Sequence, residues 1–253
     1  MVWYREQFGE NYIPKLKDVL ISRIQTWFRD KYGPAIIGIS GGKDSTVCAA
    51  LMVEALGKTR VFGVLMPNGV QSDIEDSIQV VNHLEIPYTL VNIQAAYDSI
   101  VTQITNPLST MPKEVNYSCK TNTPTRLRMT TLYAIAAQLN GFVCCTDNAS
   151  EGYTGFSTKW GDSVGDFSIL YDVLATDVMK LGDVLNLPKE LAYKVPSDGM
   201  CGMSDEEKMG FTYQELDDFI NGIKQPAMDK MLRMKALHDN PNRLKKQIQW
   251  TET

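Results

Sequence analysis

The fold of this chain is decided by the segment Ala35-Ile36-Ile37-Gly38-Ile39-Ser40-Gly41-Gly42-Lys43-Asp44-Ser45-Thr46. Its isoleucines form a short β-branched run of the kind that fills a buried parallel strand. Paired glycines follow, and Asp44-Ser45-Thr46 then offers capping side chains ahead of a helix expected over residues 47–56. Because glycine has no Cβ atom, consecutive backbone N–H groups of the turn can point at one place, where the helix dipole adds partial positive charge. The segment therefore predicts a strand–turn–helix unit that binds phosphate.

Lys43 supports a phosphate site, because a cation in the first turn of a helix opposes the dipole by ~0.3–1 kcal/mol and is better tolerated where an anion docks beside it. The segment is not a Walker loop, which needs glycine where this chain has Ile37 and Ser or Thr where it has Asp44. The pattern Ser-Gly-Gly-x-Asp-Ser at 40–45 instead resembles the PP-loop of ATP pyrophosphatases, which cleave ATP between its α and β phosphates and adenylylate a substrate oxygen. A tight turn without a ligand is the alternative, and the full match after a β-branched strand favours the nucleotide.

Composition and charge limit the function classes. The chain has 253 residues, of which 43% are hydrophobic and 22% charged, as is ordinary for a soluble globular protein. No segment approaches the ~20 apolar residues of a membrane span. A net charge of −5 argues against a broad nucleic-acid surface, which is usually strongly basic. We therefore expect neither a membrane nor a nucleic acid as partner.

The N-terminus and the cysteines bear on location. Residues 1–10 carry charges and no apolar signal core, so export is not expected. The five cysteines include no C-x-x-C pair and their number is odd, which favours free thiols over disulfides or a zinc site. We therefore expect a cytoplasmic protein.

Strands and helices are expected to alternate along the chain. After an N-terminal helix at about 13–31 and the segment quoted above, apolar spacing and turn signals predict a strand at 61–66, a helix at 72–84, a strand at 87–91, a helix at 93–104 and a strand at 141–146. This alternation predicts an α/β fold, a doubly wound parallel sheet flanked by helices. In such sheets the ligand site lies at the C-terminal ends of the strands, where the glycine turn is found.

We expect one domain over residues 1–253, made of the N-terminal helix, a core at about 35–222 and a helical C-terminal tail at about 225–253. Met228, Met231 and Leu232 are expected to share one face of the tail helix, and core packing or a partner surface explains that face better than a cofactor site.

A further helix is predicted to run from Thr123-Pro124, an N-cap followed by a proline at the first helical position, to Leu139. Arg126 and Arg128 then lie near the helix start, where two cations are unfavourable unless they pair with acids or point at an anionic ligand. These residues alone leave both explanations open.

Thr146 and Glu151 follow the strand at 141–146, so both can reach the ligand crevice. Glu151 could simply interact with the dipole of the next helix. A carboxylate near a triphosphate, however, is a natural partner for Mg²⁺, which prefers oxygen ligands and phosphates. The glycine-rich stretch 152–162 suits a functional loop.

Four blocks of sequence together resemble one family, the ammonia-dependent NAD synthetases. The blocks recur in the family's order over roughly residues 15–222, and they are Gly38-Ile39-Ser40-Gly41-Gly42-Lys43-Asp44-Ser45, Thr125-Arg126-Leu127-Arg128-Met129 with Leu132-Tyr133-Ala134, Thr146-Asp147-Asn148-Ala149-Ser150-Glu151 with Gly155-Phe156-Ser157-Thr158-Lys159-Trp160-Gly161-Asp162, and Asp205-Glu206 with Gly210-Phe211-Thr212-Tyr213. The PP-loop alone indicates only a superfamily with the adenine nucleotide alpha hydrolase-like fold. The third block is specific to NAD synthetases.

The resemblance implies an amide-forming carbon–nitrogen ligase. ATP adenylylates the nicotinate carboxylate of deamido-NAD (nicotinic acid adenine dinucleotide) with release of pyrophosphate, and ammonia then displaces AMP to give NAD. It also implies Mg²⁺ and a homodimer whose interface helps to build the substrate site. Attack by a carboxylate on a polyanion needs charge neutralisation and alignment more than a protein nucleophile.

The resemblance also implies residue roles by position. Asp44 and Glu151 are the expected catalytic carboxylates that hold Mg²⁺. The residues expected to bind ATP are Gly38, Ile39, Ser40, Gly41, Gly42, Lys43, Asp44, Ser45, Thr146 and Ser197. Those expected to bind deamido-NAD are Arg126, Lys159, Asp166 and Lys245, the last as the best candidate for a lysine that the family carries near its C-terminus.

The chain departs from the family at Ala175, where many members have a lysine beside ATP. Lys43 is the obvious substitute, since its side chain is long enough to reach the β or γ phosphate. Two other hypotheses remain. Another PP-loop adenylylating ligase is disfavoured by the acidic charge of the chain, and a nucleotide-binding regulator without turnover is disfavoured by the retention of Asp44 and Glu151.

Overall fold

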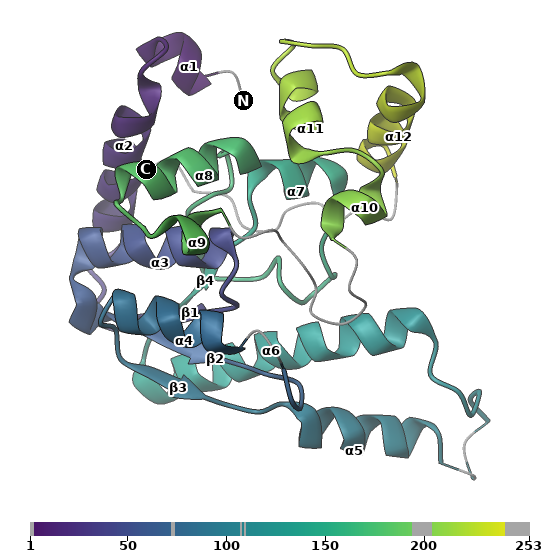
Figure 1. Ribbon diagram of the computed structural model, residues 1–253. Coiled ribbons are helices and arrows are strands. Elements are labelled where there is room, and N and C mark those ends of the chain that lie inside the picture. Colours follow the sequence, from purple (N-terminus) through teal and green to yellow (C-terminus); the bar gives the residue numbers. More distant parts are fainter. Residues whose placement is uncertain (1–2, 72–73, 107, 109, 194–203, 241–253) are drawn as a thin grey trace.

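A parallel sheet forms the centre of the computed structural model, which describes residues 3–71, 74–106, 108, 110–193 and 204–240. Its five strands lie in the order β3-β2-β1-β4-β5 (Figure 1). They are β1 (Ala35–Gly38), β2 (Val61–Leu65), β3 (Tyr88–Leu90), β4 (Phe142–Cys145) and β5 (Phe167–Ser168). Because the chain starts in the middle and builds outward to both edges, the predicted doubly wound sheet is confirmed. Strand β5 was not predicted, since two residues are too few to show a period.

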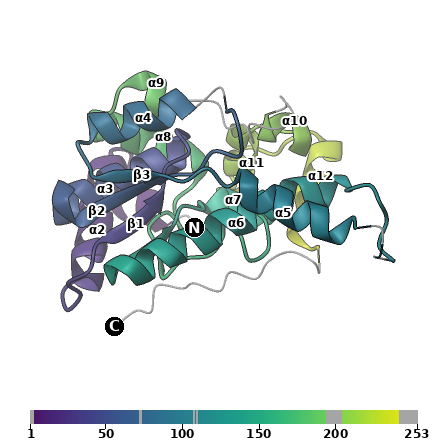
Figure 2. The same ribbon diagram turned by 90° about the horizontal axis from the view of Figure 1, so that it is seen from below.

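Helices cover both faces of the sheet (Figures 1 and 2). One face carries α2 (Tyr12–Trp27), α3 (Lys43–Leu56), α4 (Ile74–His83) and α8 (Ala175–Val184), and the other carries α5 (Gln94–Ile104) and α6 (Tyr117–Leu139). The remaining elements are α1 (Trp3–Phe8), η1 (Lys58–Arg60), α7 (Ala149–Thr154), α9 (Lys189–Ala192), α10 (Asp205–Met209), α11 (Tyr213–Ile220) and α12 (Met228–His238). Among the helices of these described segments, none has the length and apolarity to span a bilayer.

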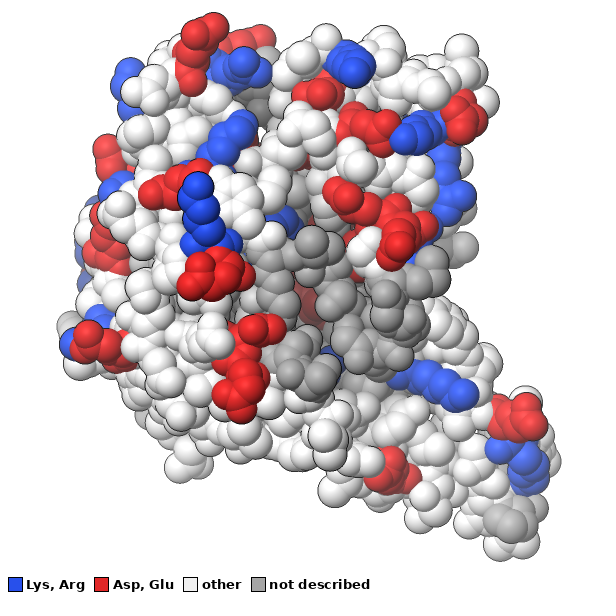
Figure 3. Space-filling view, in the orientation of Figure 1, with Lys and Arg blue, Asp and Glu red and all other residues white. Residues whose placement is uncertain are grey.

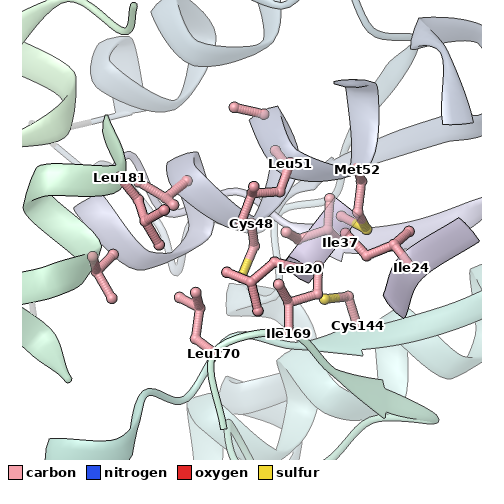
Figure 4. Close-up of a cluster of buried hydrophobic side chains, with 14 of the residues drawn as sticks. Leu20, Ile24, Ile37, Cys48, Leu51, Met52, Cys144, Ile169, Leu170 and Leu181 are labelled. Carbon is pink, nitrogen blue, oxygen red and sulfur yellow. The ribbon is translucent and has the colours of Figure 1, made fainter. Parts of the chain in front are cut away.

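The β-branched run of β1 fills the core on both sides of the sheet. Successive side chains of a strand point to opposite faces, so Ile37 joins the large cluster under α2, α3 and α8 while Ile36 packs under α6. The large cluster includes Leu20 and Ile24 of α2 and Leu51 of α3 (Figure 4), and all three are fully buried. The segment that carries the glycine turn is therefore held from both faces.

Helix α3 begins earlier than expected. It starts at Lys43, and its N-cap is Gly42, which makes no side-chain cap hydrogen bond. The prediction that Asp44-Ser45-Thr46 caps a helix at 47–56 is therefore wrong. The hydroxyls of Ser45 and Thr46 instead donate to the Gly42 carbonyl at 3.1 and 2.8 Å, because a hydroxyl inside a helix can bond back to a carbonyl of the preceding turn. Lys43 and Asp44 thus enter the first helical turn.

Helix α6 also begins earlier than expected, at Tyr117. The Asn116 side chain caps it by accepting a hydrogen bond from Cys119 N at 2.9 Å, and Pro124 lies inside the helix. The proline removes one backbone donor, which a helix of 23 residues tolerates. Arg126 and Arg128 therefore lie beyond the first turn, where the dipole no longer disfavours them.

The helices near the two ends of the chain have other bounds than expected. Helix α2 stops at Trp27 rather than near residue 31, since Lys31 Nζ bonds the Trp27 carbonyl at 2.6 Å and satisfies the helix end. In the tail, helix α12 ends at His238, and residues 241–253 lie outside the described part of the chain. Met234 is its buried residue, whereas Met228 and Leu232 of the predicted face are exposed.

Candidate active site

The glycine turn between β1 and α3 is shaped for close approach. Gly41 has a φ of +76°, and a Cβ atom there would lie 2.8 Å from Asp76 Cβ, so both conformation and space require glycine. The Ser40 and Ser45 hydroxyls lie 3.1 Å apart, and the former accepts a hydrogen bond from Gly42 N at 3.2 Å. The first N–H groups of α3 have no partner within the helix. The turn can therefore bind an anion, as the sequence predicts.

Asn148 joins two carboxylates at the crevice, one through its side chain and one through its backbone N–H. Asn148 caps α7, and its Nδ2 donates to Asp44 Oδ1 at 3.0 Å. Its backbone N–H donates to Glu151 Oε2 at 3.0 Å in a capping box. Asp44 and Glu151 are 107 positions apart in sequence, yet one residue holds both, so the structure brings together the pair predicted to bind the metal.

Acidic groups crowd around this pair. Burial first, and then the nearby carboxylates of Asp44 and Asp147, raise the pKa of Glu151 well above its ordinary value. Lys43 is only 3% exposed, and its Nζ forms an ion pair with Asp44 Oδ2 at 2.6 Å. The crevice therefore holds excess negative charge close to the N-terminus of α3, which is a suitable setting for a cation.

A cavity of about 370 Å³ opens beside the glycine turn, at the C-terminal ends of β1 and β4. Its walls contain most of the residues predicted to bind ATP and Mg²⁺, namely Gly38, Ile39, Ser40, Gly42, Lys43, Asp44, Ser45, Thr146 and Glu151. Gly41 adjoins these residues without lining the cavity. Ser197, also predicted to bind ATP, lies outside the described residues, as does Lys245.

The roles assigned from the sequence leave out several residues that line the cavity, among them Arg128, for which an acid pair and an anionic ligand were both left open. Arg128 of α6 reaches the cavity and donates from Nε to the Met66 carbonyl at 3.1 Å. Asp162 lines it as well, and burial raises the pKa of Asp162 to about 6 although a backbone N–H of Thr158 and the charge of Arg128 act in the other direction. The spacing of Thr125, Arg128 and Leu132 places them on one face of a helix, and that signal could have identified Arg128.

The residues predicted to bind the dinucleotide lie beside the cavity, on elements that also line it. Arg126 Nε donates to the Lys159 carbonyl at 3.0 Å, which joins α6 to the loop after α7. Asp166 accepts from Val143 N at 2.7 Å and therefore anchors the end of that loop to β4. None of these three predicted residues is part of the described cavity wall. Arg126, Lys159 and Asp166 therefore form a surface beside the cavity, which we call the shoulder.

A buried hydrogen-bond chain fixes α7 against its neighbours. Ser150 Oγ donates to Asp217 Oδ1 of α11 at 2.5 Å and accepts from Ala175 N of α8 at 2.9 Å. Asp217 Oδ2 accepts from Thr176 N at 2.9 Å. Helix α12 adds a stacked contact, with the rings of His238 and Tyr153 4.1 Å apart. The element that carries Glu151 is therefore held by three other helices.

Charges of both signs are mixed over the face of the molecule seen in Figure 3, and the visible atoms form no extended basic patch. This agrees with the net charge of −5.

Comparisons with known proteins match most of the chain. A family model described as NAD synthase matches residues 12–252. The NH(3)-dependent NAD(+) synthetase of Thermococcus sibiricus is 39% identical over 196 residues, which cover 77% of this chain and 74% of the relative.

Solved structures are similar in fold. The structure of NMN synthetase from Francisella tularensis superimposes with a TM-score of 0.80 at 33% identity, over 89% of this chain and 92% of that one. The NH3-dependent NAD synthetase from Campylobacter jejuni, solved in complex with the nitrate ion, has a TM-score of 0.70 at 23% identity and matching coverage of 89% and 93%. At the lower identity the likeness shows the fold.

The Asp217 network predicts a specific pH dependence. Burial raises the pKa of Asp217 to about 6, above its unfolded value, so between about pH 4 and 6 the folded state binds the proton more tightly. The free energy of unfolding should therefore fall as pH rises through this window and level off above it. In Asp217→Asn this contribution is absent, so the difference between wild type and variant should fall by on the order of 2–3 kcal/mol. Urea unfolding from pH 4 to 8 measures it.

Ser150→Ala is the companion variant. It removes a hydroxyl whose hydrogen bond favours the ionised carboxylate of Asp217, so the pH window should move upward. Parallel pH curves for wild type and Asp217→Asn would contradict the assignment.

Proposed function

The chain belongs to the NAD synthase family, and from that membership we propose how its crevice performs the family's reaction. The protein is a ligase that uses ATP and ammonia to convert deamido-NAD to NAD. One observation carries the assignment to this crevice: the glycine turn, Thr146 and both predicted carboxylates line a single cavity at the ends of β1 and β4. We propose that the described residues form one domain that carries out the whole reaction.

The reaction has two steps. A nicotinate carboxylate oxygen bonds to the α phosphorus of ATP, and the bond from that phosphorus to the oxygen bridging it to the β phosphate breaks, which releases pyrophosphate. Ammonia then bonds to the carboxyl carbon, the bond from that carbon to the AMP oxygen breaks, and the nitrogen loses a proton. We assign the N–H groups of the glycine turn and of α3 to the β and γ phosphates. No protein nucleophile is needed, because the enzyme supplies alignment and charge.

We assign Mg²⁺ to Asp44 and Glu151. Among the described residues no group of three or more His, Cys, Asp or Glu side chains is arranged to hold an ion. Mg²⁺ commonly binds through one or two carboxylates and completes its shell with phosphates and water, so a pair of acids beside a phosphate site fits. The Tyr213 hydroxyl, buried near both acids without a hydrogen-bond partner in the described structure, also fits a site completed by its ligand. When bound, the ion would neutralise phosphate charge.

A second substrate deserves the same test, because the similar structure from Francisella tularensis is named an NMN synthetase and is 33% identical. The same chemistry on nicotinate mononucleotide would give nicotinamide mononucleotide. The mononucleotide lacks the adenosine half of the dinucleotide, so it would need fewer contacts on the shoulder formed by Arg126, Lys159 and Asp166. Relative efficiency with the two acids decides which one the chain prefers.

The oligomeric state and the cellular location are also proposals. We propose a homodimer, since Ile100 of α5, Leu139 of α6 and Leu90 of the edge strand β3 are exposed apolar side chains. We propose a cytoplasmic location, since the cysteines in the described part of the chain are all free thiols.

The assay for the proposed function uses purified protein, ATP, Mg²⁺ and ammonium, with deamido-NAD or nicotinate mononucleotide as the acid. We expect NAD, AMP and pyrophosphate in equal amounts, with a higher kcat/KM for the dinucleotide. Glutamine should not replace ammonium when free ammonia is scavenged. Formation of ADP and phosphate, or of no amide with either acid, would overturn the assignment.

Asp44→Asn and Glu151→Gln should each lower kcat by ~10²–10³, in the range for loss of one electrostatic stabiliser of a transition state. Folding should hardly change, because the Gln side chain keeps an oxygen that can accept from Asn148 N. Glu215→Gln is the matched control, since Glu215 fills the same capping role at Thr212 in α11 but does not line the cavity. Near-wild-type turnover at saturating ATP in either variant removes that residue from the metal site.

Lys159→Ala should raise the KM for deamido-NAD roughly tenfold or more, as expected for loss of a charged contact, and should leave the KM for ATP unchanged. Lys58→Ala is the control, because Lys58 lies on η1, at the opposite end of β2 from the cavity. A change in the ATP KM alone would show that Lys159 serves the other substrate. An equal loss with the mononucleotide would place Lys159 near the nicotinate ribotide.

A further inference from the structure

Lys43 brings an ammonium group into the acidic crevice. Its Nζ forms an ion pair with Asp44 Oδ2 at 2.6 Å and lies 5.1 Å from the centre of the Tyr213 ring. Two further acids, Glu151 of α7 and Asp205 of α10, lie near the ammonium. The ammonium is therefore paired with one carboxylate and lies near acids from two other segments of the chain.

The carboxylate that holds Lys43 is also the one assigned to Mg²⁺. Asp44 Oδ1 already accepts a hydrogen bond from Asn148, and Asp44 Oδ2 is taken by Lys43. Asn148 is fixed, because it also caps α7. Lys43 is on a flexible stem of four carbons. A divalent ion that binds Asp44 would lie close to the charge of the Lys43 ammonium and be repelled by it, and of the two partners of Asp44 the lysine is the one able to move away.

A new partner for the displaced ammonium is indicated by Tyr213. Its side chain is 4% exposed, and its hydroxyl has no hydrogen-bond partner among the residues that the structure describes. Burying a hydroxyl without a hydrogen-bond partner is unfavourable, so this hydroxyl points to a group supplied by a ligand. The acids Glu151, Asp205 and Asp44 lie near the hydroxyl. They would repel an anionic ligand unless cations bind together with it. A phosphate oxygen arriving with Mg²⁺ would accept hydrogen bonds from both the hydroxyl and the ammonium.

Ala175 is consistent with this arrangement. It is fully buried in the same cluster as Tyr213, so the position where the resemblance implies a lysine lies in the cluster whose aromatic ring Lys43 reaches. The cation at this place is supplied by the glycine turn instead of by α8.

We propose that Lys43 is an internal counter-ion that occupies Asp44 in the nucleotide-free protein, competes there with Mg²⁺, and transfers to the phosphates when ATP and the metal bind together. Metal alone then binds weakly, and metal and nucleotide strengthen each other because ATP gives the displaced ammonium a new partner. The proposal rests on the proposed nucleotide site, and its test does not require turnover.

The test measures binding of Mn²⁺, as a paramagnetic substitute for Mg²⁺, by the electron paramagnetic resonance signal of the free ion. Lys43→Met removes the charge and keeps an unbranched chain. Without nucleotide, it should bind Mn²⁺ at least about tenfold more tightly than wild type, within the usual range of coupling between sites. With Mn²⁺ present, it should bind α,β-methylene ATP, which cannot be cleaved between the α and β phosphates, at least about tenfold more weakly. The two changes have opposite signs, which a merely structural lysine would not produce.

Controls separate the alternatives. Lys180→Met removes a surface lysine that pairs with Asp177 and should change neither affinity, whereas Asp44→Asn should abolish metal binding in both backgrounds. Lys43→Gln replaces Lys43→Met if the latter does not fold. Equal Mn²⁺ affinity in wild type and Lys43→Met, or a loss of both affinities, would overturn the proposal. If the opposite changes appear but no amide is formed in the assay above, the counter-ion role stands and the assigned reaction fails.

Discussion

The geometry of the site depends on one residue, Asn148, which connects the elements that follow β1 and β4. It caps α7 after β4, and its amide also binds Asp44 in the first turn of α3 after β1. The second carboxylate, Glu151, is held by the backbone of the same residue. Without this connection each half would carry one acid on a separate helix terminus. A single residue thus sets the relation between two carboxylates that would otherwise repel each other, and repulsion between like charges is strongest where water is excluded.

Much of the fold follows from short-range signals, and the exceptions have local causes. Alternating apolar strands and helices predicted the parallel sheet. The predicted start of α3 was wrong because the helix is capped by Gly42, which has no capping side chain. The predicted start of α6 was wrong because Asn116 caps the helix ahead of the Thr123-Pro124 signal. β5 was invisible, since its two residues acquire their role only from pairing with β4.

The site residues that belong to a sequence motif were predictable from the sequence. Those that reach the cavity from other elements were less so. Lys43, Asp44 and Glu151 were found from sequence, and the structure brings them to one cavity. Arg128 and Asp162 were not assigned a role because they act through tertiary placement: one reaches over from α6 and the other is buried by a loop. The need for Asn148 to join the acids could not be read from spacing, since its amide meets a carboxylate more than a hundred positions away.

The order in which the chain supplies the cavity has a consequence for its biogenesis. The centre of the sheet is made by pairing Ala35 with Phe142, and Asp205 of α10 lies in the cavity wall. Contacts between segments so distant in sequence form late in folding, because a long loop must close before they contribute any stability. During synthesis on the ribosome, the glycine turn between β1 and α3 therefore emerges long before the rest of the cavity is available. ATP can act as a ligand that favours folding only at the last stage, once nearly the whole chain has been synthesised.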